Sequence, residues 1–202
     1  FNFDPVKVYA DSIRVSLGSA NAAICDPNGQ LICYSGGYWL ESPEAEIVEG
    51  SKNLINHAQT TIKTQLDSNG LFGSPQGILM LPTPEKENRE FFVFNFAVDT
   101  FVQQMDDFAY TKVAYQGKIL TVLEKCKLVT SGKTFYSAYV SACRHGNGRD
   151  WWSFAVEVGY AKAHLFLFTT DGIIKDVVLD LNVKVEEIIS DGVTNFSIDG
   201  KK

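Results

Sequence analysis

The chain has 202 residues, of which 45% are hydrophobic and 21% are charged, so it is neither a disordered nor a fibrous sequence. Its 24 acidic and 18 basic residues give a net charge of -6, which argues against a nucleic-acid-binding protein because such a protein presents a basic face to phosphate. No apolar run approaches the roughly 20 residues that cross a bilayer as a helix, so the sequence predicts no transmembrane segment.

The first half of the chain shows strand signals on either side of one long irregular stretch. Residues 19–25 and 31–34 are predicted strands, joined at 26–29 by the sequence DPNG, which is typical of a type I turn. Residues 41–75 fit no clear period, and we expect a long loop with a short helix there. Residues 78–81 and 91–98 (FFVFNFAV) then form a predicted hairpin with an eight-residue connection.

The second half repeats short strands separated by Gly-containing turns. The predicted strands are 108–115, 118–123, 134–144, 151–158, 163–169, 173–181 and 193–198. Ten or more short strands at this spacing, in a chain with 14 Phe, 8 Tyr and 3 Trp, predict an antiparallel all-β fold. A sandwich, a barrel and a propeller all satisfy this pattern.

The four cysteines, Cys25, Cys33, Cys126 and Cys143, fit no zinc-binding spacing. Across the turn at 26–29, we expect Cys25 to face Gln30 and Cys33 to face Ala22, which would hold their sulfur atoms too far apart to bond. We predict that the four are small buried core residues. The sequence leaves their disulfide status open, including a Cys126–Cys143 bridge.

Histidine and acidic residues offer few candidates for catalysis. His145 lies between Arg144 and Asp150, but the glycines at 146 and 148 predict a tight turn whose own hydrogen bonds explain these residues. His57 and His164 are isolated and show no metal-binding spacing.

Acidic residues likewise form no motif that requires a site. Asp26 and Asn28 are turn residues, because Pro27 and Gln30 break the calcium-loop pattern. The acid pairs at 106–107 and 186–187 are expected on solvated surface, although glycoside chemistry uses two carboxylates. The segment 35–37 lacks the flanks of a nucleophile motif. The sequence therefore predicts no catalytic, cofactor-binding or metal-binding residue and no cofactor.

Aromatic side chains could alternatively form a platform on which a carbohydrate stacks. The candidates are Trp39, Trp151, Trp152, Tyr136, Tyr139 and Tyr160. Because adjacent strand residues point to opposite faces, one of Trp151 and Trp152 must face the core. We predict packing roles for both.

Several segments in a fixed order carry a family resemblance. They are 22–37 (AAICDPNGQLICYSGG), 76–84 (QGILMLPTP) running on to 90–94 (EFFVF), 144–152 (RHGNGRDWW), 168–173 (FTTDGI) and 197–202 (SIDGKK). Over about residues 18–202 the chain resembles the β-propeller-like domain near the N-terminus of large secreted surface proteins of Bacteroidetes. Many of those carry a C-terminal sorting domain for type IX secretion. Residues 41–75 match poorly, and 38–42 (YWLES) stand where the family has a Trp-Asn motif.

The resemblance implies a fold and an organisation. It implies one propeller-like region over residues 1–202, with about four blades, each a four-stranded antiparallel meander. It also implies that these residues are the N-terminal part of a longer chain and roughly half of a ring. The aromatic residues would then pack between neighbouring blades.

The resemblance also implies a function. The expected function is a secreted, non-catalytic binding or adhesion module at the cell surface. Its partners would be a surface protein or polysaccharide, the remaining blades of a parent chain or another subunit, and no nucleic acid. Two alternatives stay open: a polysaccharide-active hydrolase or lyase, and a structural subunit of a surface, secretion, gliding or filament assembly.

Overall fold

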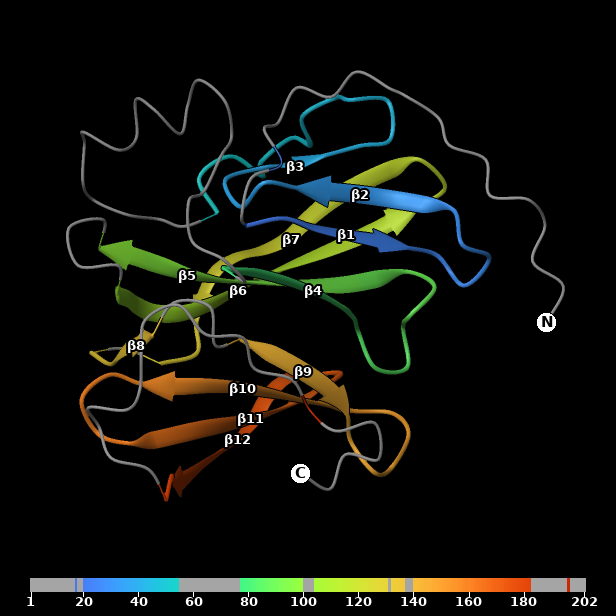
Figure 1. Cartoon of the computed structure of the whole chain (residues 1–202). Helices are drawn as coiled ribbons and strands as arrows, with labels where there is room; N and C mark the ends of the chain where they lie inside the picture. The colour runs from blue at the N-terminus through green and yellow to red at the C-terminus, as the bar shows by residue number, and fades with distance from the viewer. Residues whose placement is uncertain are drawn as a thin grey trace, which may run out of the picture.

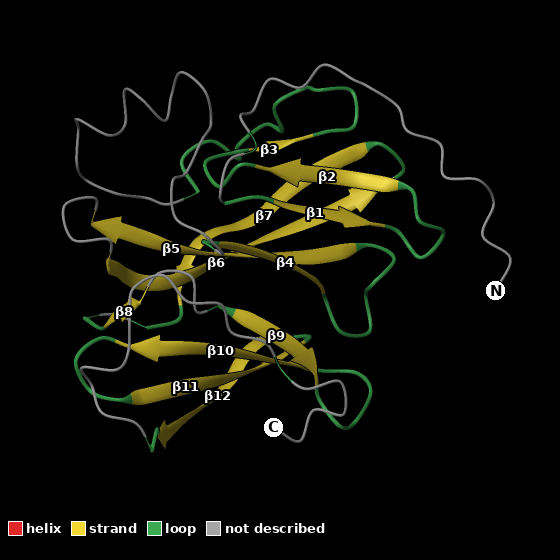
Figure 2. Ribbon diagram, viewed as in Figure 1, coloured by secondary structure: helices red, strands yellow, loops and turns green. Residues whose placement is uncertain are grey.

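The computed structural model describes residues 17, 20–54, 77–99, 104–130, 132–136, 140–182 and 196, with the side chains of 96–99 and 104–107 left out. These residues form twelve strands and no helix (Figure 2). All pairings between the strands are antiparallel, so the all-β prediction is confirmed. Within the same residues, no helix is long and apolar enough to cross a membrane.

The first sheet is a three-stranded meander of β1 (Ala22–Cys25), β2 (Leu31–Ser35) and β3 (Leu40–Glu41). The predicted turn between β1 and β2 is confirmed, because the Gly29 amide donates to the Asp26 carbonyl at 2.9 Å. Gly29 has a φ of 81°, a conformation that glycine adopts without steric cost. The Asp26 carboxylate also accepts from the Asn28 amide at 2.9 Å, which fixes the turn further.

A second meander contains β4 (Ile78–Pro82), β5 (Glu90–Asp99), β6 (Gln104–Gln116) and β7 (Ile119–Leu128), each paired with the next. The predicted hairpin of 78–81 and 91–98 is confirmed as the β4–β5 pair. The four strands lie in sequence order because short turns can join only antiparallel neighbours.

The third meander contains β9 (Ser141–Arg144), β10 (Trp151–Glu157), β11 (Lys162–Thr169) and β12 (Gly172–Asp180). The short strand β8 (Thr134–Tyr136) pairs with both β6 and β10 and so links the second and third meanders into one nine-stranded sheet. The predicted strand at 134–144 is present in part, as the two strands β8 and β9. Both pair with β10, and β8 pairs with β6 as well, while residues 137–139 lie outside the description.

The three meanders lie one above the other, with the β4–β7 meander between the other two (Figure 1). Phe92 and Phe94 of β5 point to the β9–β12 side, and the Phe94 and Phe168 ring centroids are 4.2 Å apart. On the opposite side of the middle meander, Asn95 donates to the Leu54 carbonyl of the segment that follows β3. Alternation along β5 thus presents one row of side chains to each neighbouring layer.

An aromatic core joins the middle and third meanders. Phe108 of β6 packs on Phe166 of β11 with ring centroids 5.1 Å apart, and both rings are fully buried. Tyr110 packs edge-on against Phe92 at 5.3 Å. Such tilted and edge-to-face contacts are favoured by the charge distribution of aromatic rings, which explains why a Phe-rich sequence holds these layers together.

Two early predictions fall partly outside the described residues. In 41–54 the structure has the end of β3 and a series of turns without a helix, and 55–75 lie outside the description. Of the predicted strand at 193–198, only Phe196 is described, and its ring lies 6.3 Å from that of Phe154.

The predicted cysteine register is wrong by a small shift. Cys33 pairs with Ile24 and Cys25 with Leu31, because an irregularity between Ile24 and Cys25 shifts the register at the turn. All four cysteines are free thiols. The prediction that all four are buried holds for Cys33 and is wrong for Cys25, which is exposed, while Cys126 and Cys143 are half-buried. Burial raises the pKa of the Cys33 thiol, so this side chain behaves as a small apolar group.

Gly172, the first residue of β12, has little room for a side chain. Its φ is +104°, and an added Cβ would lie 3.0 Å from the Tyr110 hydroxyl. We expect Gly172→Ala to lower the free energy of unfolding by about 1–3 kcal/mol, the usual cost of such backbone strain. Gly146→Ala is the matched control, because nothing lies within 4 Å of a Cβ there. Equal urea midpoints for the two variants would contradict this account.

Candidate functional site

The turns of all three meanders gather at one end of the molecule, on the right in Figure 1. They are the turns at 26–29, 83–89, 117–118, 145–150 and 170–171, and we call this surface the turn face. In an antiparallel meander every second turn lies at the same end. Stacked meanders therefore bring turns that are far apart in the sequence together.

Side-chain contacts tie the turns of the middle and third meanders to each other. Arg149 forms an ion pair with Glu85 at 2.9 Å, and the Thr170 hydroxyl donates to the Pro84 carbonyl at 2.9 Å. The Trp151 indole donates to the Pro82 carbonyl at 3.1 Å. These contacts hold the turns at 83–89, 145–150 and 170–171 together as one surface.

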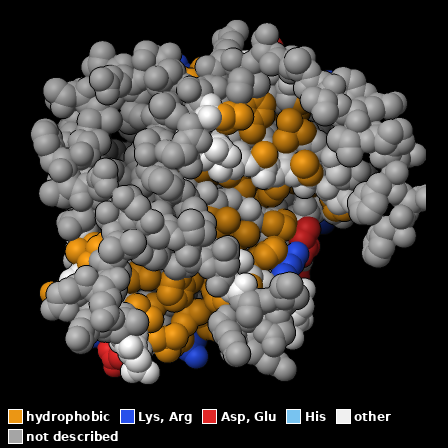
Figure 3. Space-filling model, viewed as in Figure 1, with side chains coloured by type: hydrophobic (Ala, Val, Ile, Leu, Met, Phe, Trp, Pro, Cys, Tyr) orange, Lys and Arg blue, Asp and Glu red, His pale blue; other side chains and the backbone are white. Residues whose placement is uncertain are grey.

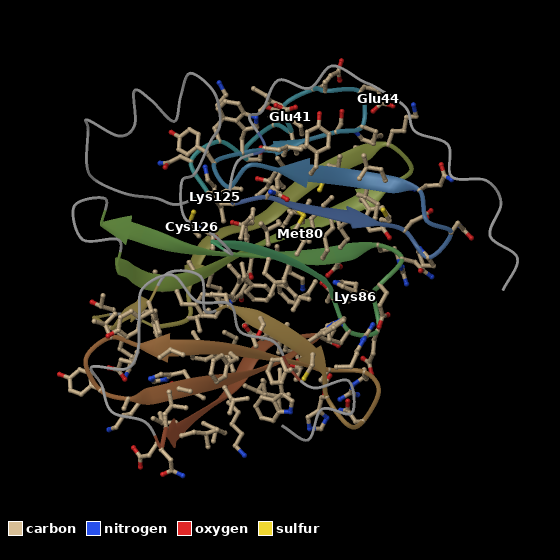
Figure 4. All side chains as sticks on the ribbon, viewed as in Figure 1. Glu41, Glu44, Met80, Lys86, Lys125 and Cys126 are labelled. Atoms are coloured by element: carbon tan, nitrogen blue, oxygen red, sulfur yellow. The ribbon has the colours of Figure 1, made fainter. Side chains whose placement is uncertain are left out.

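The exposed part of the turn face carries both signs of charge. Acidic and basic atoms stand together beside the β4–β5 turn in Figure 3, to the right of centre, and Figure 4 labels Lys86 on this turn. Lys86 and Lys112 both contact the Glu90 carboxylate, at 3.2 and 3.1 Å. Burial raises the pKa of Glu90, but hydrogen bonds from the two lysines outweigh burial and hold it below its ordinary value.

The turn at 145–150 is braced from within, as the sequence predicts. The His145 amide donates to the Asp150 carbonyl at 2.8 Å, and His145 Nδ1 accepts from the Asn147 amide at 3.1 Å. The Asp150 carboxylate accepts from Arg149 Nε at 2.9 Å and from Asn147 Nδ2 at 2.6 Å. Because Asp150 binds these neighbours, it does not orient His145 as a catalytic base, and both residues shape the turn.

Asp150 gives this turn a dependence on pH. The hydrogen bond from Arg149 lowers the pKa of Asp150, burial opposes it, and Asn147 adds to the lowering. A carboxyl whose pKa is lower in the folded state stabilises the protein above its unfolded pKa and loses that effect as the pH falls through the folded value. We expect Asp150→Asn to lower the free energy of unfolding by about 1–2 kcal/mol at pH 7, because it removes the charged acceptor of Arg149. The loss is no larger because Arg149 is half exposed and water screens the ion pair.

The difference between the wild-type protein and Asp150→Asn should be smaller at an acidic pH below the lowered pKa of Asp150 than at pH 7, since the wild-type carboxyl is then protonated. Urea unfolding of both proteins at the two pH values measures this difference. A difference that stays constant with pH would show that the charge of Asp150 plays no part in the turn.

The aromatic candidates do not form one platform. Trp39 is buried, while Trp151 and Trp152 are half-buried on opposite faces of β10. The Arg144 guanidinium lies 4.0 Å from the centroid of the Trp151 ring, which occupies that face of the indole. Tyr160 is 64% exposed but lies in the β10–β11 turn, away from the turn face. Tyr136 is half-buried in β8, and Tyr139 lies outside the described residues.

His164 is the site that sequence reasoning missed. Its side chain is fully buried in β11 between Glu157 of β10 and Asp176 of β12. Its Nε2 lies 2.9 Å from a Glu157 oxygen, and its Nδ1 lies 3.0 Å from an Asp176 oxygen. The residues are 7 and 12 positions away in sequence, so only the pairing of three strands brings them together.

Glu41 is the centre of a second buried polar group, in the first meander. Its two carboxylate oxygens accept from the Tyr34 hydroxyl and from the Trp39 indole, each at 2.8 Å. The side chains are almost fully buried. A carboxylate removed from water needs hydrogen-bond donors. Because one of the two donors, Tyr34, belongs to β2 and Glu41 belongs to β3, the carboxylate connects these strands.

The remaining acidic candidates contribute no site geometry. Asp106 and Asp107 belong to β6, but their side chains are not described, and residues 186–187 lie outside the description. Asp26 and Asn28 form the turn described above. Among the described residues, no set of three or more His, Cys, Asp and Glu side chains is arranged to hold a metal ion.

No family model, curated protein or solved structure matches the chain. The candidate functional surface is therefore defined by the chain's own geometry, and it is the turn face.

Proposed function

We propose that this chain is a secreted, non-catalytic binding or adhesion module of the cell surface, built on a β-propeller scaffold, and that it binds a protein or a polysaccharide through the turn face. The observation that carries the proposal is the convergence of five turns at one end of the molecule, three of which are joined by side-chain contacts. Loops held by a rigid scaffold are the common location of binding residues.

The scaffold part of the proposal draws on the stacking of meanders. The β4–β7 and β9–β12 meanders each have four consecutive antiparallel strands, as a propeller blade does. The faces of these two meanders contact each other through a layer of aromatic side chains, as expected between neighbouring blades. Within the described residues the strands do not close into a ring, so further blades, from a parent chain or another subunit, are part of the proposal.

Exposed apolar side chains on the outer strands are consistent with further packing partners. On β7 and β12 they are Ile119, Leu123, Leu128, Ile174, Val178 and Leu179. Hydrophobic atoms also cover much of the visible surface over the β9–β12 meander in Figure 3. This observation keeps the structural subunit of a surface assembly as the second candidate function, since large apolar surface usually marks an interface.

The enzyme alternative has less support in the described residues. The acid–histidine grouping at His164 is sealed, because the His164 side chain has no exposed surface. A polysaccharide could not reach the imidazole without rearrangement of the sheet. A general acid or base must come within hydrogen-bond distance of its substrate.

The test is a binding screen with a matched pair of variants. The wild-type protein is applied to a glycan array and to intact bacterial surface fractions. The double variant Lys86→Ala/Arg144→Ala removes one charge from the β4–β5 turn and one from the end of β9, next to the turn at 145–150. It is compared with Tyr160→Ala, which removes an exposed ring from the opposite end. We expect the double variant to bind at least about tenfold more weakly and Tyr160→Ala to bind like the wild type.

Equal binding of the wild type and both variants would rule out the turn face as the binding surface. Cleavage of a retained polysaccharide would replace the proposal with the enzyme alternative. A native mass that corresponds to a closed assembly of this chain, without glycan binding, would favour the structural subunit.

A further inference from the structure

His164 is the buried titratable group that the proposed binding function does not use. It lies in β11 with its imidazole between two carboxylates from the two neighbouring strands. The ring stacks on Phe166 with centroids 5.7 Å apart and meets the edge of Phe135 at 5.5 Å. Aromatic side chains therefore cover the imidazole, and the carboxylates hold both of its nitrogen atoms.

The hydrogen-bonding pattern requires a particular protonation state. A neutral imidazole has one N–H donor, whereas an ionised carboxylate only accepts. Both ring nitrogens of His164 lie 2.9–3.1 Å from carboxylate oxygens. With both carboxylates ionised, both contacts are hydrogen bonds only when the ring carries two protons. After loss of one proton, a nitrogen lone pair faces a carboxylate, and that contact becomes unfavourable.

The surrounding charges balance a protonated ring. His164 contacts Glu157 and Asp176, and the Lys133 Nζ lies 3.3 Å from Glu157. In the strand register, Lys162 of β11 is opposite Glu157 of β10 and Asp180 of β12, two residues from His164. On β6, Asp106 pairs with Thr134, and its side chain is not described.

The two carboxylates differ in how firmly they are held. Burial raises the pKa of Glu157, but hydrogen bonds from His164 and Lys133 outweigh burial and keep it below its ordinary value. The Glu157 side chain is 13% exposed, whereas the Asp176 side chain is 36% exposed and can be hydrated. A neutral His164 therefore keeps its bond to Glu157, and the Asp176 contact opens.

We propose that the Glu157–His164–Asp176 bridge is a proton-operated clamp on strand β12. The protonated imidazole fastens β12 to β11 and β10, and deprotonation releases the Asp176 side. β12 is the strand that responds to this change of protonation, because it is an edge strand of the nine-stranded sheet. In the described part of the chain it pairs with β11 alone. The clamp is independent of the turn face and of what the turn face binds.

Amide hydrogen exchange and imidazole NMR test the clamp in the intact chain. Between about pH 5.5 and pH 8.5 we expect the protection factors of β12 amides to fall about tenfold, the effect of one hydrogen bond to a charged group, while those of β5 stay constant. Nitrogen shifts of His164 should show two N–H groups at the lower pH and one at the higher pH.

Two variants of β12 separate the clamp from general effects of charge. Asp176→Asn replaces the carboxylate with an amide, which can donate to a neutral imidazole or accept from a protonated one, so the dependence of β12 protection on pH should disappear. Asp180→Asn removes a charge from the same strand and should leave the wild-type dependence unchanged. β12 protection that does not vary with pH in the wild type, or that varies equally in Asp176→Asn, would overturn the clamp.

Discussion

Phe94→Ala is expected to lower the free energy of unfolding by about 3–5 kcal/mol, the cost of removing a fully buried aromatic ring. Phe94 contacts Phe168 at 4.2 Å and Phe108 at 5.8 Å between ring centroids. Its loss leaves a cavity between the middle and third meanders, where close packing holds two layers together. Chemical denaturation followed by tryptophan fluorescence measures the effect.

Ile119→Ala on β7 is the control for this variant. Ile119 is 71% exposed, so its truncation should change the free energy of unfolding by less than about 0.5 kcal/mol. A loss for Phe94→Ala that is no larger than that of the control would mean that the two layers do not depend on the aromatic core.

Glu41→Ala should be as damaging as the loss of a core ring, at about 3–5 kcal/mol. The substitution leaves the Tyr34 hydroxyl and the Trp39 indole without their carboxylate acceptor in a buried environment. Each unpaired buried donor costs about 1–3 kcal/mol. Thermal unfolding and urea unfolding should both show this loss of stability, because the substitution weakens the first meander as a whole.

Two further substitutions give the Glu41 result its controls. Glu41→Gln keeps one carbonyl acceptor and should therefore lose less stability than Glu41→Ala. Glu44, labelled with Glu41 in Figure 4, pairs with Lys118 on the exposed surface. Glu44→Ala should leave stability unchanged, since exposed ion pairs contribute little. A Glu41→Ala protein as stable as Glu44→Ala would contradict the structural role of the buried carboxylate.

Local sequence patterns predict most of the strands and turns correctly. The run at 91–98 and the glycine turns at 26–29 and 146–150 have strong local signals, so they appear in the structure nearly where expected. Residues 134–144 carry one strand signal but contain two strands, β8 and β9, which both pair with β10. The additional pairing of β8 with β6 joins the second and third meanders, and the local sequence does not encode this long-range contact.

The turn face and the buried polar groups are predicted much less well. The motifs at 26–29, 144–152 and 168–173 are visible in the sequence, but their convergence depends on how the meanders stack. His164 looks isolated because its partners come from two other strands. Glu41 lies in a segment of weak periodicity, and its donors Tyr34 and Trp39 carry no motif. Pairing across strands, rather than spacing along the chain, creates these sites.

A double-mutant cycle between Phe94 and Phe168 tests most directly whether the middle and third meanders stack as neighbouring layers. The conservative variants Phe94→Leu and Phe168→Leu, alone and together, should fold and allow the free energies of unfolding to be compared. The stacked arrangement predicts a coupling energy of about 0.5–1.5 kcal/mol between the two rings. Strictly additive effects would place the two rings out of contact and contradict the layered fold.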